Sequence, residues 1–378
     1  MRVVVVGAGA WGLPAAAELA RRGHEVTLVD RHGTAHQLGS SSGPTRLWRL
    51  SHPDRHRVRL AQRSVEAWHR LEADSGITAI LERGLLWRDV VTSSLVAAAL
   101  TAEGVPHTVV DPGDVATFFP GLRPDGRVGI WQETAGPVLA RAALDAQAAL
   151  FAMAHGEVVC GPVIREIDTT ADGVLLTAEG GRTFQADVVV LAPGPGAGPL
   201  LEQLGVHLTL HPVLEQVCHV GHAPDTDDLP CLYDGPQGDE PGMYAMPTPG
   251  RGYKLGIDLP LRDWHEDDVN RVPDAHVSAM ISERVVRNFV DLDPTVLDAQ
   301  VCSWTDSPDG RFVIDTLAEG RIVLACGDSG EGFKFSALMG LVLADLVEGA
   351  PEDADIVPFG LLRFAAGEPE PRPHVLGR

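Results

Sequence analysis

Two lysines stand out in this chain as candidates for chemistry. Of its 30 lysine and arginine residues, only Lys254 and Lys334 are lysine. Lysine is a compact ammonium whose pKa shifts readily on burial, whereas the arginine guanidinium keeps its charge. The lysines stand in glycine- and aromatic-containing segments, Tyr253-Lys254-Leu255-Gly256 and Gly332-Phe333-Lys334-Phe335. We therefore predict that both are enclosed and functional. The alternative is chance survival in a chain that otherwise uses arginine.

A glycine-rich turn near the N-terminus predicts a dinucleotide site. Gly7, Gly9 and Gly12 form G-x-G-x-x-G between an apolar run at 2–6 and a helical pattern at 13–22, and Asp30 ends a second apolar run. In this strand–turn–helix setting the glycines admit a pyrophosphate to the helix N-terminus, and the acid can bind a ribose. The pattern does not distinguish NAD from FAD, and the alternative is a glycine turn without a ligand.

Other patterns point less clearly to chemistry. Residues 39–43 match the G-x-S-x-G elbow of hydrolases, but residues 33–38 are not the apolar strand that this motif requires. A small-residue loop near a phosphate or flavin is favoured instead. The histidines and cysteine within 52–56 and 218–222 have no evident third and fourth ligand, so no metal site is predicted.

Composition restricts the partners. A net charge of −22 argues against binding to nucleic acid or to an anionic membrane. Glycine and proline interrupt the long apolar runs, and the first strand begins at Arg2, so neither a membrane span nor a signal peptide is predicted and a cytoplasmic location is expected. Five cysteines show no disulfide or zinc spacing. A monomer or homodimer is expected.

The remaining patterns predict an α/β (α+β) fold with about two domains. Strands are predicted at 157–176 with a turn at 171–173, and at 186–191, 253–258, 301–305 and 321–325, with helices at 58–73 and 332–346. Because no low-complexity linker separates the elements, the domains are expected to interleave.

Five motifs in order resemble the FAD-dependent amine oxidases of the D-amino-acid oxidase superfamily, in the branch of sarcosine, N-methyltryptophan and pipecolate-type oxidases. The first is Gly7 to Gly12 with Asp30. The others are Gly43-x-Thr45-Arg46-x-x-Arg49, Tyr253 to Gly256, Cys302-x-Trp304-Thr305 continuing to Asp315, and Gly327-x-Ser329-Gly330-x-Gly332-Phe333-Lys334-Phe335. The resemblance runs from Arg2 to about Phe364.

The resemblance implies a role for each matching residue. Cys302 resembles the cysteine joined to the flavin by a thioether, and Lys254 resembles the lysine that activates oxygen. Arg49 and Lys334 resemble the pair that holds the substrate carboxylate, and Arg46 lies near the flavin ring. The remaining cofactor-binding positions are Gly7, Gly9, Gly12, Asp30, Ser42, Thr45, Val163 in a strand after the middle helix, Gly194, Gly330, Gly332, Phe333 and Lys334.

The same resemblance implies two interleaved domains. A Rossmann-like FAD-binding domain takes residues 1–82, 150–208 and 298–378. A mixed-sheet substrate domain takes residues 83–149 and 209–297.

The chain departs from the sarcosine oxidase pattern at the substrate end. Ser42 and Asp258 replace histidines, Trp304 replaces a tyrosine, and Asp328 and Glu331 add acids. Asp258 is a candidate to orient a substrate nitrogen or to accept its proton; the alternative is a solvated residue at a strand end.

The function implied is that of an FAD-dependent oxidase of a carboxylate-bearing amine, a secondary or cyclic amino acid. It would use O2 and give an imine and hydrogen peroxide, and the departures hint at a specialised biosynthetic pathway. The first alternative is a flavin-dependent dehydrogenase with another electron acceptor. An NAD-dependent dehydrogenase and a serine hydrolase are the others.

Overall fold

The computed structural model describes residues 1–365 and 367–369; the end of the segment 298–378 thus lies outside the described residues. A six-stranded sheet holds the glycine-rich turn, and its strand order is β19-β20-β12-β1-β2-β8. All neighbours are parallel except β19 and β20. The bounds are β1 Arg2–Val6, β2 Glu25–Asp30, β8 Glu157–Cys160, β12 Val188–Leu191, β19 Val313–Leu317 and β20 Ile322–Cys326. The strands predicted at 2–6 and 26–30 are confirmed, whereas the run 186–191 is divided at Asp187 between two sheets.

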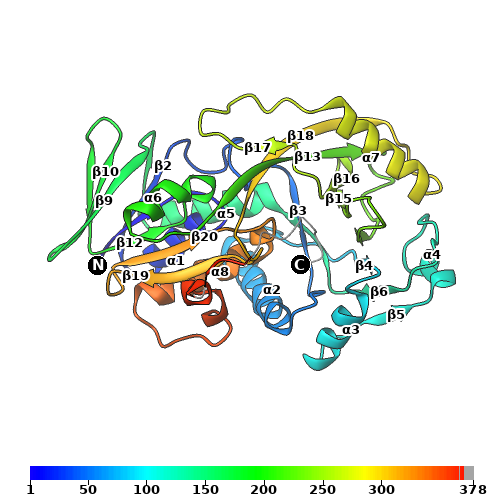
Figure 1. Ribbon diagram of the computed structural model, residues 1–378, viewed down its shortest axis with the longest axis horizontal. Helices are drawn as coiled ribbons and strands as arrows, with labels where there is room; N and C mark the ends of the chain where they lie inside the picture. The colour runs from blue at the N-terminus through cyan, green and yellow to red at the C-terminus, as the bar shows by residue number, and fades with distance from the viewer. Residues whose placement is uncertain (366, 370–378) are drawn as a thin grey trace.

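The alternation of side chains along these strands builds a core on each face of the sheet. Val3 and Val5 face a helical layer, and Val4 and Val6 face a three-stranded sheet and a short helix. The helices are α1 Gly12–Arg21, α2 Arg55–Ser75, α5 Ala140–Met153 and α8 Ser336–Val347. The opposite layer consists of β9 Ile164–Thr170, β10 Gly173–Ala178, β11 Thr183–Ala186 and α6 Ala197–Gln203. Figure 1 shows the β9–β10 hairpin at one end of the molecule.

A nine-stranded mixed sheet forms the other half of the fold (Figure 1). Its path is β17-β13-β16-β15-β14-β4-β6-β5, and β18 pairs with β13 on the side. The bounds are β4 Leu85–Arg88, β5 Thr108–Val110, β6 Gly129–Gln132, β13 His211–Val220, β14 Cys231–Asp234, β15 Met243–Thr248, β16 Gly252–Ile257, β17 Arg262–Asp263 and β18 Val296–Asp306. The helices α3 Ser93–Ala102, α4 Val115–Phe118 and α7 Ala275–Asn288 belong to this half of the chain.

A two-stranded sheet and the short connection 307–312 lie between the two large sheets. β3 Thr45–Trp48 pairs with β7 Gly136–Leu139 in a two-stranded sheet and contacts β15. β18 leaves the nine-stranded sheet and the chain then enters β19 of the six-stranded sheet. The division into 1–82, 150–208 and 298–378 against 83–149 and 209–297 stays a prediction, and its last boundary falls inside β18.

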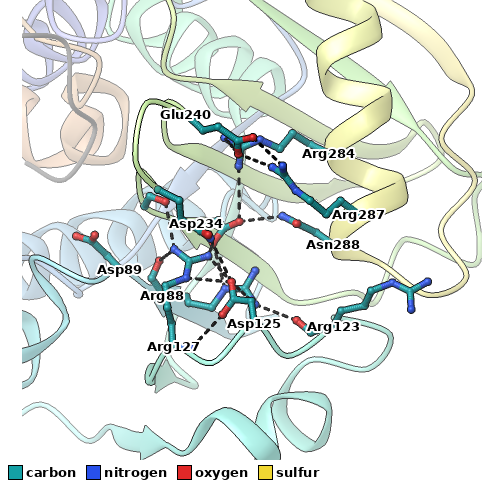
Figure 2. Close-up of polar contacts among 12 residues, drawn as sticks. Arg88, Asp89, Arg123, Asp125, Arg127, Asp234, Glu240, Arg284, Arg287 and Asn288 are labelled. Atoms are coloured by element: carbon teal, nitrogen blue, oxygen red, sulfur yellow. Dashed lines mark hydrogen bonds and ion pairs between the residues drawn. The ribbon is translucent and has the colours of Figure 1, made fainter.

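A buried ionic network ties α7 to the nine-stranded sheet (Figure 2). The Asp234 carboxylate is fully buried at the end of β14 and accepts from Arg88 Nε at 3.1 Å and from Asn288 Nδ2 at 2.8 Å. Arg127 also bonds to the Asp234 Oδ1 atom. Because a buried carboxylate is stable only when it is paired, this network fixes the end of α7 against β4 and β14.

Removing this carboxylate is expected to destabilise the fold. Asp234→Ala leaves the buried Arg88 guanidinium without its nearest partner, so we expect the free energy of unfolding to fall by about 3–5 kcal/mol. The matched control is Asp228→Ala, because Asp228 pairs with Arg83 while 90% of its side chain is exposed. Urea denaturation checks both variants, and equal stability of the two would contradict the role of the network.

Candidate active site

A cavity of about 490 Å³ lies at the carboxyl ends of β1, β2, β12 and β20 and extends to the nine-stranded sheet. Among the predicted site residues, those that line it are Gly7, Gly9, Asp30, Arg46, Arg49, Val163, Gly194, Lys254, Asp258, Cys302, Gly330, Gly332, Phe333 and Lys334. Gly12, Ser42 and Thr45 do not line it. The tertiary structure therefore brings together most of the residues that the sequence singled out.

The glycine turn is shaped by close backbone approaches. Gly7 has a φ of +102°, and a Cβ atom there would lie 2.2 Å from the carbonyl oxygen of Ala192. A Cβ atom on Gly12 would lie 1.9 Å from the carbonyl oxygen of Gly7. Gly12 therefore allows α1 to pack directly on the turn, which explains its place in the motif although it does not face the cavity.

Replacing Gly12 tests this close approach. In Gly12→Ala the added methyl group must push the turn apart, and we expect a loss of about 1–3 kcal/mol in the free energy of unfolding together with a lower flavin content. Gly113→Ala is the control, because a Cβ atom at Gly113 would have no neighbour within 4 Å and its φ is not positive. Chemical denaturation and the flavin absorbance per chain measure both effects; a Gly12→Ala protein as stable and as yellow as the control would sink the explanation.

Polar groups hold the turn from the side. The Asp30 carboxylate accepts from the backbone N–H of Ala8 at 2.8 Å and of Gly33 at 2.9 Å. The Ser41 hydroxyl accepts from the N–H of Ala10 at 2.8 Å. The sequence pointed to Ser42 in this loop, but Ser41 is the serine that faces the turn and the cavity. The Ser42 carbonyl oxygen accepts instead from Arg46.

The hydrolase interpretation of residues 39–43 is wrong on structural grounds. β2 ends at Asp30, and residues 31–44 contain neither strand nor helix. The strand-to-helix turn that a nucleophile elbow needs is therefore missing.

The cavity residues fit a flavin adenine dinucleotide. Gly7 and Gly9 lie at the helix end suited to a pyrophosphate, and Asp30 lines the cavity beside them. Gly194 and Gly196 have open space where a Cβ atom would stand, which leaves a cradle at the end of β12. Val163 lines the same region; it immediately precedes β9, whereas a position within a strand was predicted.

Lys254 is buried on β16, with 2% of its surface exposed. Its Nζ donates to the carbonyl oxygen of Thr45 at 2.8 Å, so Thr45 acts on the site through its backbone. Burial, and then the nearby Arg46 guanidinium, lower the pKa of Lys254 to about 7. The prediction that both lysines are enclosed is confirmed, since Lys334 is 8% exposed.

Arg49 and Lys334 meet at a buried carboxylate. Glu331 Oε1 lies 3.1 Å from Arg49 Nη2 and 3.6 Å from Lys334 Nζ, and Glu331 Oε2 lies 3.4 Å from Arg57 Nη1. Burial lowers the pKa of Lys334 to about 7, and the Glu331 charge opposes that shift. Burial also lowers the pKa of Arg49, again opposed by Glu331. The sequence marked Glu331 as a departure but did not reveal these contacts.

Asp258 is buried in the cavity wall, with 4% of its surface exposed, so the alternative of a solvated residue is wrong. Sequence reasoning missed its neighbour Glu215 on β13, which is 5% exposed and accepts from the Tyr244 hydroxyl at 3.0 Å. Nothing local to residues 211–220 marks Glu215, beyond its being the acidic residue of this strand.

Cys302 lies opposite Glu215 in the pairing of β13 with β18. Burial, and then the Glu215 charge, raise the pKa of its thiol. Residues 332–335 form a 3₁₀ helix before α8, where one α-helix over 332–346 was predicted. Asp328 lies in the loop before this 3₁₀ helix, and burial raises its pKa to about 6.

The family described as FAD dependent oxidoreductase (DAO) matches residues 2–346. The chain belongs to this family. It is an FAD-dependent oxidoreductase that acts on C–N bonds, and its α/β fold is that of the family. The glycine motif, which by itself did not distinguish NAD from FAD, is therefore assigned to FAD.

Relatives cover nearly the whole chain. Human peroxisomal sarcosine oxidase is 27% identical over 96% of this chain and 95% of that protein. N-methyl-L-tryptophan oxidase of Escherichia coli is 28% identical over 96% and 99%. The open form of NikD, an amino acid oxidase essential for nikkomycin biosynthesis, has a TM-score of 0.84 at 27% identity and covers 95% of this chain and 96% of that one.

The described residues offer neither a membrane-spanning helix nor a cluster of metal ligands. None of their helices is both long and apolar enough to cross a membrane. Within the same part of the chain, no group of three or more His, Cys, Asp or Glu side chains is arranged to hold a metal ion.

Proposed function

We propose that the protein oxidises a secondary or cyclic amino acid at its C–N bond to an imine, with O2 as electron acceptor and hydrogen peroxide as product. The observation that carries the proposal is the meeting of Arg49 and Lys334 in the same cavity as Lys254 and Asp258. Relatives named for the oxidation of sarcosine and N-methyltryptophan support a substrate with a secondary amine and a carboxylate.

The charges around Glu331 support a carboxylate ligand. Three cationic side chains, Arg49, Arg57 and Lys334, surround this one carboxylate. Glu331 offsets one positive charge and holds Arg49 and Lys334 in place. The remaining positive charge, in a site shielded from water, favours a second carboxylate from the substrate. A substrate bound by its carboxylate at this point would direct its amine into the cavity that Asp258 and Lys254 also line.

Two other residues of the cavity lining suit the amine and the oxygen. Asp258 can orient a substrate nitrogen, and the Lys254 ammonium can stabilise the negative charge that forms when oxygen is reduced. FAD, when bound, supplies the acceptor for two electrons and returns them to oxygen. The side chains of the chain itself bind, orient and exclude water, since Lys254, Asp258 and Arg49 are all buried.

The proposal is tested with the purified yellow protein. Anaerobic mixing with sarcosine, L-proline and L-pipecolate should bleach the flavin with at least one of them, and aerobic turnover should release peroxide in proportion to oxygen consumed. A flavin that is bleached by substrate but reoxidised only by an added dye would favour the dehydrogenase alternative. A flavin that no secondary or cyclic amino acid bleaches would contradict the proposal.

We further propose that Cys302 carries the flavin covalently. Its side chain lines the cavity beside Lys254, and a thiolate is the reactive form of cysteine. Acid precipitation of the wild-type protein should give a yellow pellet. The Cys302→Ser pellet should be white, and that of Cys160→Ser, at an exposed cysteine outside the cavity lining, should stay yellow. A white wild-type pellet would show that the flavin is not covalently bound.

A further inference from the structure

Glu215 is a buried carboxyl group in the cavity wall to which the mechanism above assigns no part. It comes from the middle of β13, a strand that contributes no other residue to the cavity lining. The Glu215 carboxyl group accepts a hydrogen bond from the Tyr244 hydroxyl. Because burying a carboxyl group is costly unless it is partnered or neutral, its presence in a buried stretch of β13 calls for a chemical reason.

The register of the sheet brings Glu215 to the reactive end of the cavity. It stands directly opposite Cys302 on β18. On its other side β13 pairs with β16, with Val217 opposite Gly256 and His219 opposite Lys254. Side chains two residues apart share a face of a strand, so Glu215 and Lys254 lie on the same face of the sheet.

A glycine allows Tyr244 to reach Glu215 across β16. Tyr244 is paired with Gly256, and a Cβ atom on Gly256 would lie 2.4 Å from the Tyr244 ring. The ring therefore lies over Gly256, and its hydroxyl meets the Glu215 carboxyl one strand further on. The contact between Glu215 and Tyr244 thus depends on the three adjacent strands β13, β16 and β15. All three strands contribute residues to the cavity lining.

The surroundings of Glu215 raise its pKa, so the carboxylate that can accept a proton becomes populated as the pH rises toward 8. Burial is the largest effect and raises its pKa to about 8; the Asp258 charge raises it further, while Tyr244, Lys254 and Arg46 oppose the shift. The titratable and charged groups that face it are Tyr244 on β15, Lys254 and Asp258 on and after β16, Cys302 on β18 and Arg46 on β3.

We propose that Glu215 accepts the proton of the substrate ammonium, with Tyr244 and Asp258 as the groups that set its basicity. This inference rests on the proposed function. In the step, an N–H bond of the ammonium breaks and an O–H bond forms on Glu215, while the electron pair of the N–H bond stays on nitrogen. No electrons leave the substrate in this step. The freed lone pair is what forms the C=N bond when the neighbouring C–H bond is oxidised.

The raised pKa of Glu215 suits proton transfer from the substrate ammonium. An ordinary carboxylate is a poor base for an alkylammonium, whose pKa is about 10.4, because the two pKa values differ by about six. A pKa of about 8 for Glu215 narrows that difference to about two. The proton then passes to a buried group in the cavity lining and not to bulk water.

The experiment uses the FAD-loaded enzyme and two matched probes, L-proline and tetrahydrofuran-2-carboxylate, in which an ether oxygen replaces the amine. For wild type, the ratio of the anaerobic reduction rate to the proline dissociation constant should rise with pH through an ionisation near 8. Glu215→Gln should lower the limiting reduction rate by about 10²–10⁴-fold and lose that ionisation. Its binding of the ether acid should stay unchanged.

Two further variants should shift the Glu215 pKa in opposite directions. Asp258→Asn removes a charge that raises the Glu215 pKa, so the ionisation should move to lower pH. Tyr244→Phe removes a bond that lowers it, so the ionisation should move to higher pH. Wild-type rate and pH profile in Glu215→Gln, or equal loss of proline and ether-acid binding, would overturn the inference in favour of a structural role.

The experiments distinguish failure of the proposed function from failure of the inference about Glu215. An enzyme that no secondary or cyclic amino acid reduces contradicts the proposed function whatever Glu215 does. In that case infrared spectroscopy still tests the group, because the wild type should show a protonated-carboxyl band that titrates near pH 8 and is missing in Glu215→Gln. Absence of this band from the wild type would overturn the assignment.

Discussion

Lys254→Met is expected to slow the reaction of the reduced enzyme with oxygen by about 10²–10³-fold, the usual cost of removing one fixed electrostatic contact from a site shielded from water. Reduction by substrate under anaerobic conditions should stay nearly unchanged. The reason is that oxygen reduction creates negative charge, and Lys254 is a buried ammonium, fixed by the Thr45 carbonyl at 2.8 Å. Methionine keeps the volume and removes the charge. Stopped-flow mixing of reduced enzyme with oxygenated buffer measures the rate.

The pH dependence gives this prediction a sign. The Lys254 pKa is lowered to about 7, so the ammonium is present below pH 7 and is lost as the pH rises through it. The oxygen reaction of the wild type should therefore slow above about pH 7, and that of Lys254→Met should be insensitive to pH over the same range. Slow anaerobic reduction combined with a normal oxygen reaction would sink the role of Lys254.

The other lysine is the matched control. Lys334→Met removes another buried charge from the cavity lining, beside Glu331. It should leave the oxygen reaction within a few-fold of wild type and weaken substrate binding. Equal effects of the two substitutions on oxygen would mean that only the total charge of the cavity matters.

Arg49→Gln is expected to weaken the binding of carboxylate-bearing substrates by about 10²-fold or more. Truncating one partner of a buried charge pair costs about 2–5 kcal/mol. Arg49 is 7% exposed, and its guanidinium already lies 3.1 Å from Glu331, so it is held where a second carboxylate can reach it. The dissociation constant is measured from the perturbation of the flavin spectrum or from the substrate dependence of anaerobic reduction.

Two comparisons distinguish loss of carboxylate recognition from general disruption of the site. L-prolinol, which lacks the carboxylate, should bind wild type and Arg49→Gln alike, whereas L-proline should discriminate. Arg57→Gln removes a neighbouring cation that contacts Glu331 but does not line the cavity, and it should have a much smaller effect. Equal losses of proline and prolinol binding in Arg49→Gln would contradict a carboxylate site.

Local patterns in the sequence determined much of the fold around the cofactor. The apolar runs at 2–6 and 26–30 became β1 and β2 because a strand buried on both faces needs continuous apolar residues. Gly7 and Gly12 marked the turn because only glycine permits the close backbone approaches there. The two lysines were recognisable as enclosed from their neighbours in the chain.

The tertiary structure alone decided which side chains meet. Ser41, rather than Ser42, bonds the glycine turn. Glu331 contacts Arg49, which precedes it by 282 residues in the chain, and also Lys334. The contact of Glu215 with Tyr244 depends on the order of β13, β16 and β15 and on Gly256 between them. The spacing of apolar residues along a strand or helix, and the residue types that form a turn, are local features. They can therefore be predicted from neighbouring residues in the sequence. Strand order and register are not local, and a shift of one residue would turn Glu215 to the other face of the sheet.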